Sequence, residues 1–298
     1  MKRWLSLLLL VALAALSAGA ARADGGKPVL MANQIVASWD TPLAGYALGS
    51  DIPRCDVGRI VFADSLEGRP ADAWDVSDAG DGSVWAWASP FQNRLVELTI
   101  AGEGGVALNR DCVNLFGGYS ELRQIDFGGC VDTSGVTDMF GMFFDCGNLT
   151  QIDLSGFDTS KVTNMSAMFA GCERLKALDL SGFDTSRVTN MGGMFQSCAS
   201  LKALDLSALD TSGVRDMREM FYGCRSLKKL DLSGFDTSKV QSMDRMFAYC
   251  MALKQITLAQ GFTDNLRKEP EDMFFNCKTR SLDDCQVIRD VVGGETTA

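Results

Sequence analysis

The most regular feature of the chain is a spacing of 26 residues between equivalent apolar positions. Cysteines keep this spacing at Cys146, Cys172, Cys198, Cys224 and Cys250. A methionine stands seven residues before each of these cysteines, and leucines follow each of them after three and after eight residues. More degenerate units, one around Phe116 and one ending at Cys277, extend the pattern on both sides. A constant period of this length is typical of units that stack and complete one another's cores.

Each unit combines two shorter periodicities. Apolar side chains spaced three, three, one and three residues apart predict one face of a short helix; in one unit they are Val162, Met165, Met168, Phe169 and Cys172. The stretch from Leu178 to Ser181 alternates instead, which predicts a strand with leucines inward and aspartate and serine outward. Gly182 and the Asp-Thr-Ser triplet 184–186 are typical of turns and helix caps.

From these elements we predict an α/β repeat solenoid, a right-handed and leucine-rich-repeat-like stack with one parallel β-strand and one short helix in each 26-residue unit. In this interpretation residues 111–277 form the solenoid and residues 24–110 form a lead-in segment that caps its first unit. Residues 278–298 form a C-terminal cap and tail, and residues 1–23 a signal peptide.

The repeat sequence M-F-x-x-C-x-x-L-x-x-L-D-L-S-x-F-D-T-S, present in residues 165–190, 191–216 and 217–242, resembles that of the BspA-like family of bacterial leucine-rich repeat surface proteins. The resemblance covers roughly residues 113–277, and the stretch 82–116 is similar to the segment that leads into the repeats of that family. It implies a secreted or cell-surface protein associated with attachment, and it brings no catalytic residues.

The first 23 residues have the pattern of a secretory signal peptide. Lys2 and Arg3 precede an apolar run over residues 7–16, and Ala21 and Ala23 make an A-x-A site. We expect cleavage after Ala23, a secreted or cell-surface location, and no membrane insertion of the mature chain. Cleavage removes three of the 28 basic residues and leaves 25 against 38 acidic ones, a net charge of −13. Such a charge disfavours nucleic acid as a partner.

The chain contains no histidine, which excludes Ser/His/Asp and Cys/His catalysis and histidine-ligated metals. We therefore predict no catalytic residues, no metal and no cofactor, and a binding or adhesion function for a protein or cell-surface ligand. Two alternatives remain: a scaffold that presents a binding segment in residues 24–110, or an enzyme in that segment using Asp64, Glu67, Asp72 or Asp75.

The candidate binding surface is an outward acidic stripe with one aspartate per unit and serines beside it. Its members are Asp126, Asp153, Asp179, Asp205, Asp231, Ser155, Ser181, Ser207 and Ser233. Aspartates about 5 Å apart in a parallel sheet repel one another by roughly 0.8 kcal/mol per pair at the dielectric of water. Asparagine at these positions is therefore expected to stabilise the protein slightly and to weaken the capture of a basic partner. The alternative is that water and the serines relieve the repulsion and the stripe has no binding role.

Other candidate groups favour structural roles. The in-register cysteines lack zinc spacing and are expected to be buried thiols, with a disulfide between Cys277 and Cys285 as a hypothesis. The M-x-x-M pairs are expected in the core rather than on copper, and the Asp-Thr-Ser triplets are expected to form turns rather than a calcium site. Trp74, Trp85 and Trp87 are expected to cover the end of the stack rather than to bind sugar.

Overall fold

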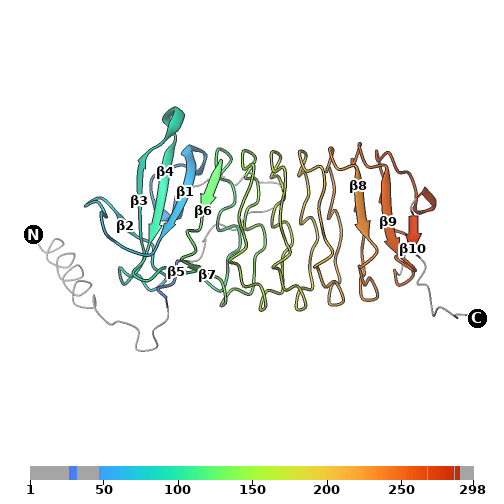
Figure 1. The fold of residues 1–298 in the computed structure, drawn as a ribbon, viewed down its shortest axis with the longest axis horizontal. Helices are drawn as coiled ribbons and strands as arrows, with labels where there is room; N and C mark the ends of the chain where they lie inside the picture. The colour runs from blue at the N-terminus through green and yellow to red at the C-terminus, as the bar shows by residue number, and fades with distance from the viewer. Residues whose placement is uncertain (1–26, 32–46, 267, 285, 289–298) are drawn as a thin grey trace, which may run out of the picture.

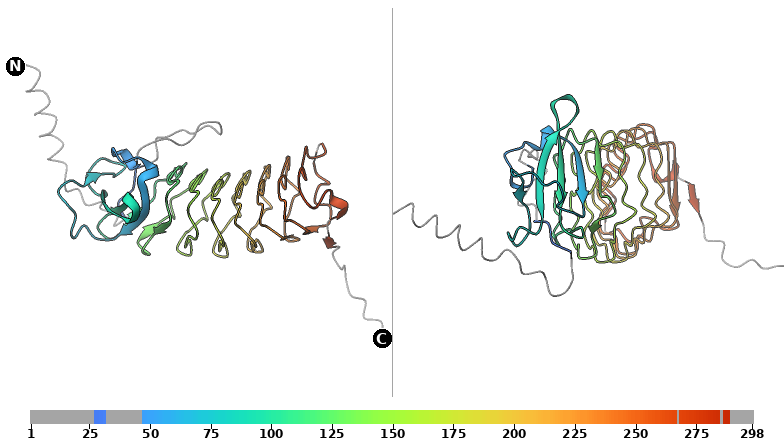
Figure 2. Two further views of the ribbon diagram at one scale, coloured as in Figure 1. Left: turned by 90° about the horizontal axis from the view of Figure 1, so that it is seen from above. Right: turned by 60° about the vertical axis from the view of Figure 1, so that its left-hand side comes forward.

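The repeats form an elongated stack in which successive units lie side by side along the long axis (Figure 1). The computed structural model describes residues 27–31, 47–266, 268–284 and 286–288. The predicted signal peptide, 1–23, and Cys285 lie outside the described residues. Figure 2 shows from above that a sheet stands at one end of the stack and strand β10 at the other. No helix in the described ranges is long and apolar enough to cross a membrane.

The first end carries most of the regular strands. Its elements are η1 (Ala47–Gly49), η2 (Arg54–Asp56), β1 (Val57–Ala63), β2 (Trp74–Asp75), β3 (Trp85–Pro90), η3 (Gln92–Arg94), β4 (Val96–Ala101), β5 (Val106–Ala107), β6 (Gln124–Asp126) and β7 (Val131–Asp132). Five of the strands form one sheet in the order β2-β3-β4-β1-β6, and β5 pairs with β7. Because β1 pairs in parallel with both β4 and β6, this sheet runs from the lead-in segment into the first repeat.

The other end has three parallel strands. They are β8 (Lys229–Leu232), β9 (Gln255–Ala259) and β10 (Gln286–Ile288), with η4 (Leu282–Asp284) before the last of them. The sheet order is β10-β9-β8. Between the two ends, neighbouring units are joined by isolated parallel bridges, such as those from Asp138 to Asn164 and from Asn164 to Asn190.

The predicted fold class is wrong, because the units contain no helix. In the described part of the chain every helix is a three-residue 3₁₀ turn, and none lies in the repeated M-x-x-M-F segment. Regular strands are also sparse, since the alternating stretches at residues 153, 179 and 205 are not strands. The structure is therefore mostly turns, coil and short sheets rather than an α/β array with a helix per unit.

Main-chain hydrogen bonding explains why no helix forms. An α-helix needs every N–H to bond four residues back in the same segment. Here alternate N–H groups leave the unit, and those of residues 139, 141, 143 and 145 donate to the carbonyls of residues 164, 166, 168 and 170 over 2.7–3.0 Å. The N–H groups between them, of residues 142, 144 and 146, bond three residues back. We call this segment, residues 139–146 and their equivalents in the other units, the turn ladder. About half of its N–H groups thus donate to carbonyls of the neighbouring unit.

The turn ladder also requires left-handed backbone at two positions per unit. In the unit that begins at Met165 these are Ala167 (φ 54°) and Gly171 (φ 77°), and in the unit that begins at Met217 they are Glu219 (φ 57°) and Gly223 (φ 71°). The same alternation still places both methionines, the phenylalanine and the cysteine of each unit inward, all fully buried. The spacing that predicts a helix face is therefore also compatible with this extended turn ladder.

The core is a set of columns that run along the stack. Phenylalanines pack face to face from Phe116 to Phe274, with ring centroids 5.3–6.1 Å apart. A buried threonine column ties units together through the main chain. For example, the Thr159 hydroxyl donates to the Asp184 carbonyl over 3.0 Å and accepts the Asp184 N–H over 2.9 Å.

The first unit of the turn ladder is closed by a buried arginine. Arg54 is 2% exposed, and its guanidinium donates to the carbonyls of Asn114 and Gly117. It also lies over the ring of Tyr119, 5.0 Å from the centroid. The Gly117 carbonyl is equivalent to the Phe144 and Ala170 carbonyls, which accept an N–H from the preceding unit. No unit precedes Gly117, so Arg54 supplies its donor, and it adds a second bond to the Asn114 carbonyl, which also accepts the Gly117 N–H.

We predict that Gly171→Ala lowers the free energy of unfolding by at least about 1 kcal/mol, because an L-residue is disfavoured at left-handed φ. The added Cβ would also lie 3.0 Å from the Asp145 Cα. The matched control is Gly182→Ala in the same unit, where a Cβ meets nothing within 4 Å and φ is not left-handed. Urea unfolding of both variants is the measurement. Equal unfolding midpoints would contradict the left-handed backbone that the turn ladder places at residue 171.

Candidate functional site

The predicted acidic stripe lies on the outside of the stack, but its carboxylates close turns. Asp153, Asp179, Asp205 and Asp231 are exposed, and Asp126 is partly exposed. Each accepts the backbone N–H two residues further on, over 2.9–3.0 Å. In four of the five units that N–H belongs to the neighbouring serine of the stripe, Ser155, Ser181, Ser207 or Ser233. The repeated aspartate and serine therefore form an Asx turn in these units.

The environment favours the charged form of these aspartates. Hydrogen bonds from the serine N–H and hydroxyl lower the pKa of Asp153, Asp179 and Asp205, and the neighbouring carboxylate contributes less than these bonds. At Asp126 the charge is offset further by Arg59, which lies 3.7 Å from it and 2.8 Å from Glu97. The expectation that asparagine stabilises the protein by relieving repulsion is therefore not supported.

The Asp-Thr-Ser triplets use their oxygens in the same way. Asp158, Asp184, Asp210 and Asp236 each accept the N–H of the serine two residues on, over 2.8–3.0 Å. The threonines between them point inward and bond to the next unit. In the part of the chain that is described, no three Cys, Asp or Glu side chains gather at a site that could hold a metal ion.

The cysteine column is buried, and each thiol donates to a main-chain carbonyl. Cys146, Cys172, Cys198, Cys224 and Cys250 contact the carbonyl of a phenylalanine in the preceding unit over 3.0–3.2 Å. Burial raises the pKa of Cys146 and of Cys224 to about 12. Cys277 is partly exposed, and its hypothetical disulfide partner Cys285 lies outside the described residues.

The residues proposed for the lead-in segment also have structural contacts. Asp75 accepts hydrogen bonds from Ser77 and from the Gly82 N–H. Trp74 packs against the core and donates its Nε1–H to the Leu48 carbonyl, while Trp85 lies under the Arg69 guanidinium at 3.9 Å. Trp87 is partly buried, and Asp64, Glu67 and Asp72 are exposed.

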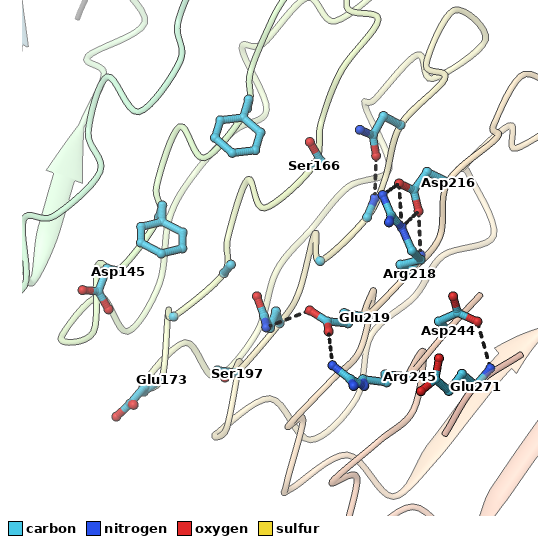
Figure 3. Close-up of a pocket in the computed structure, with 18 residues that line it drawn as sticks. Asp145, Ser166, Glu173, Ser197, Asp216, Arg218, Glu219, Asp244, Arg245 and Glu271 are labelled. Atoms are coloured by element: carbon cyan, nitrogen blue, oxygen red, sulfur yellow. Dashed lines mark hydrogen bonds and ion pairs between the residues drawn. The ribbon is translucent and has the colours of Figure 1, made fainter. Parts of the chain in front are cut away.

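A hollow lies along the turn ladder, in a place that the sequence did not indicate. It has a volume of about 790 Å³ and extends from the unit that begins at Met139 to the last unit (Figure 3). Its walls are outward-facing residues of the turn ladders, such as Phe140, which lies between the two methionines of its unit, and Asp145, which lies after them. The lining side chains include Phe140, Phe144, Asp145, Glu173, Gln196, Asp216, Arg218, Glu219, Asp244, Arg245 and Glu271.

Charge is distributed unevenly along this hollow. Six carboxylates line it against two guanidinium groups. At one end Arg218 is paired with Asp216 over 2.6 Å and Arg245 with Glu219 over 3.6 Å. At the other end the side-chain carboxylates of Asp145 and Glu173 have no hydrogen-bond or ion-pair partner among the described residues, and the Glu271 carboxylate in the last unit has none either. Desolvation and the nearby Glu173 raise the pKa of Asp145. This end therefore carries uncompensated negative charge beside Phe140 and Phe144, which line the same hollow.

Comparison of the units with one another separates this hollow from the stripe. The stripe repeats the same aspartate in each unit, whereas the first outward pair of the turn ladder reads Phe-Gly, Ser-Ala, Gly-Gly, Arg-Glu and Asp-Arg in successive units. The stripe aspartate is the same from Asp126 to Asp231 and is replaced by Thr257 only in the next unit, whereas this outward pair is different in every unit. This variation inside a repeat was the available sequence signal for a specific surface.

A protein-family model described as "Mycoplasma protein of unknown function, DUF285" matches residues 110–203 and again residues 172–284, together more than half of the chain. No curated protein and no solved structure matches. The resemblance to BspA-like proteins stays a prediction.

We predict that stability depends on pH through the stripe. Since Asp153, Asp179 and Asp205 have lowered pKa values in the folded state, their contribution is present above the unfolded value and is lost as the pH falls below about 4. The variant with asparagine at these three positions keeps the turn acceptors and should lose less stability on acidification. Thermal unfolding from pH 6 to pH 2.5 measures this, and parallel curves for both proteins would refute it.

A second prediction concerns thiol reactivity. The column cysteines are buried with raised pKa values, so iodoacetamide at pH 8 should leave them unmodified in the folded protein while it labels the exposed Cys55. Mass mapping before and after unfolding in guanidinium is the measurement. Labelling of Cys172 or Cys198 at the rate of Cys55 in the native protein would contradict a closed stack.

Proposed function

Since this chain belongs to the DUF285 family, whose description assigns no function, we propose from the geometry of the hollow that it is an extracytoplasmic, non-catalytic binding protein for a cationic segment of a partner protein. One observation carries the proposal. Among the described residues, the carboxylates of Asp145 and Glu173 stand without a partner at one end of a hollow in which Arg218 and Arg245, toward the other end, are already paired with Asp216 and Glu219. Two neighbouring carboxylates repel each other, and a cation that binds to both offsets this repulsion.

The chemistry of the lining favours binding over catalysis. A lysine or arginine side chain could contact the two carboxylates and the face of a nearby phenylalanine at once. The Ser166 hydroxyl in the hollow donates to the Asn164 amide oxygen over 2.7 Å, and an amide is not a base that activates a nucleophile. The absence of histidine and the predicted signal peptide support the same proposal.

The proposal predicts a salt-sensitive interaction at the hollow. Fluorescein-labelled oligolysine should bind the mature protein at low ionic strength, and the double variant D145N/E173Q should weaken this binding by about tenfold, or about 1.4 kcal/mol. Raised salt should weaken binding to the wild type as well. Fluorescence anisotropy measures the affinity, and circular dichroism checks the fold of each variant.

The control removes the same number of charges from the stripe. D179N/D205N changes the net charge equally and keeps both turn acceptors, so binding should change by less than about twofold. Equal loss in both double variants would show that only net charge matters and would overturn the proposal. Loss in the stripe variant alone would move the binding surface to the stripe.

A further inference from the structure

The two ends of the turn ladder differ. At the first end the buried Arg54 donates to the Gly117 and Asn114 carbonyls, and the five-stranded sheet joins the lead-in segment to the first unit. At the last end β10 covers the strand side by pairing with β9. No described segment continues the turn ladder beyond residues 270–277.

The last unit leaves main-chain donors without acceptors. In each earlier unit the alternate N–H groups bond to the next unit, as those of residues 245, 247 and 249 bond to the carbonyls of residues 271, 273 and 275. The equivalent groups of the last unit belong to Asp272, Phe274 and Asn276. None of the three N–H groups has a hydrogen-bond partner among the described residues. The fourth equivalent position is Pro270, which carries no N–H.

The apolar columns are open at the same place. Phe274 and Cys277 are partly exposed, whereas their equivalents in every interior unit are fully buried. The two large hydrophobic side chains that stand out as exposed in the described part of the chain, Phe275 at 48% and Met251 at 53%, also lie at this end. An edge of free donors beside apolar side chains is a template for main-chain pairing with another segment.

We propose that this edge, residues 270–277, is a docking site for an extended segment of a partner protein with adjacent apolar and aromatic side chains. The carbonyls of that segment accept the three free N–H groups, and its aromatic ring packs on Phe274, as Phe274 itself packs on Phe247 at 5.3 Å. The interior of the stack shows the required chemistry, because every interior edge is completed by a segment with a methionine-phenylalanine pair. A second copy does not supply it, since its own segments of this kind lie inside the stack.

The test uses a synthetic peptide with the sequence of residues 190–198, with serine in place of the cysteine, and the mature full-length protein. This peptide has no charged side chain, so its binding should be insensitive to salt, unlike binding at the hollow. Hydrogen exchange of the amides of Asp272, Phe274 and Asn276 should slow by at least about tenfold on binding. The amides of Phe275 and Cys277 already bond within the unit and should change little.

Matched variants locate the contact. Phe275→Ser should weaken peptide binding by about tenfold, because it removes apolar surface at the edge. Tyr222→Ser removes the aromatic ring at the same position of an interior unit and should leave binding unchanged. A peptide with serine in place of its second methionine and its phenylalanine should not bind.

Three outcomes would overturn the proposal. The first is a peptide that binds without protecting the three amides. The second is protection without peptide that rises with protein concentration, which would assign the edge to self-association. The third is protection in the free protein that disappears when residues 289–298 are deleted, which would assign it to the chain's own tail.

Discussion

The structure depends on how main-chain donors are divided between a unit and its neighbour. Each turn ladder satisfies one half of its N–H groups by bonds three residues back and passes the other half to the next unit. A unit alone would leave these groups unpaired next to a buried core, which costs free energy for each of them. Stacking at a fixed period is therefore a condition for burying the methionine, phenylalanine and cysteine columns.

The same constraint divides the polar residues into two groups. Aspartates that recur in every unit, in the stripe and in the Asp-Thr-Ser triplets, hold Asx turns and set the path of the chain between ladders. Side chains that project outward from the ladder differ from unit to unit; Asn190 and Asp216 among them also accept the N–H two residues further on, but Asp145 and Glu173 close no turn. The uncompensated carboxylates Asp145 and Glu173 belong to this second group, and for this reason the hollow, rather than the more conspicuous stripe, supports a binding function.

The N–H groups that a turn ladder does not pair within its own unit donate to the following unit, so the two ends of the stack differ. At one end the first unit has carbonyls without a preceding unit, and the buried Arg54 guanidinium donates to one of them, that of Gly117. The other end exposes N–H groups, and the described chain covers only its strand side. Within the described residues, the stack thus has unpaired carboxylates along one side, in the hollow, and free main-chain N–H groups at its last end.

The sequence by itself determined the period, the stacking partners and the inward columns, because burial selects apolar residues at the same place in every unit. It also predicted turns at the Asp-Thr-Ser triplets, but it placed the aspartates and serines of the stripe on strands, where the structure has Asx turns in most units. It did not determine the secondary structure, because inward side chains spaced three, three, one and three residues apart satisfy both a helix face and the turn ladder. Only the tertiary structure decided between them, since half of the hydrogen bonds that define the ladder are made to a segment one unit away. The hollow was likewise decided by tertiary structure, because Asp145 and Glu173 belong to different units and approach one another only through the register of the stack.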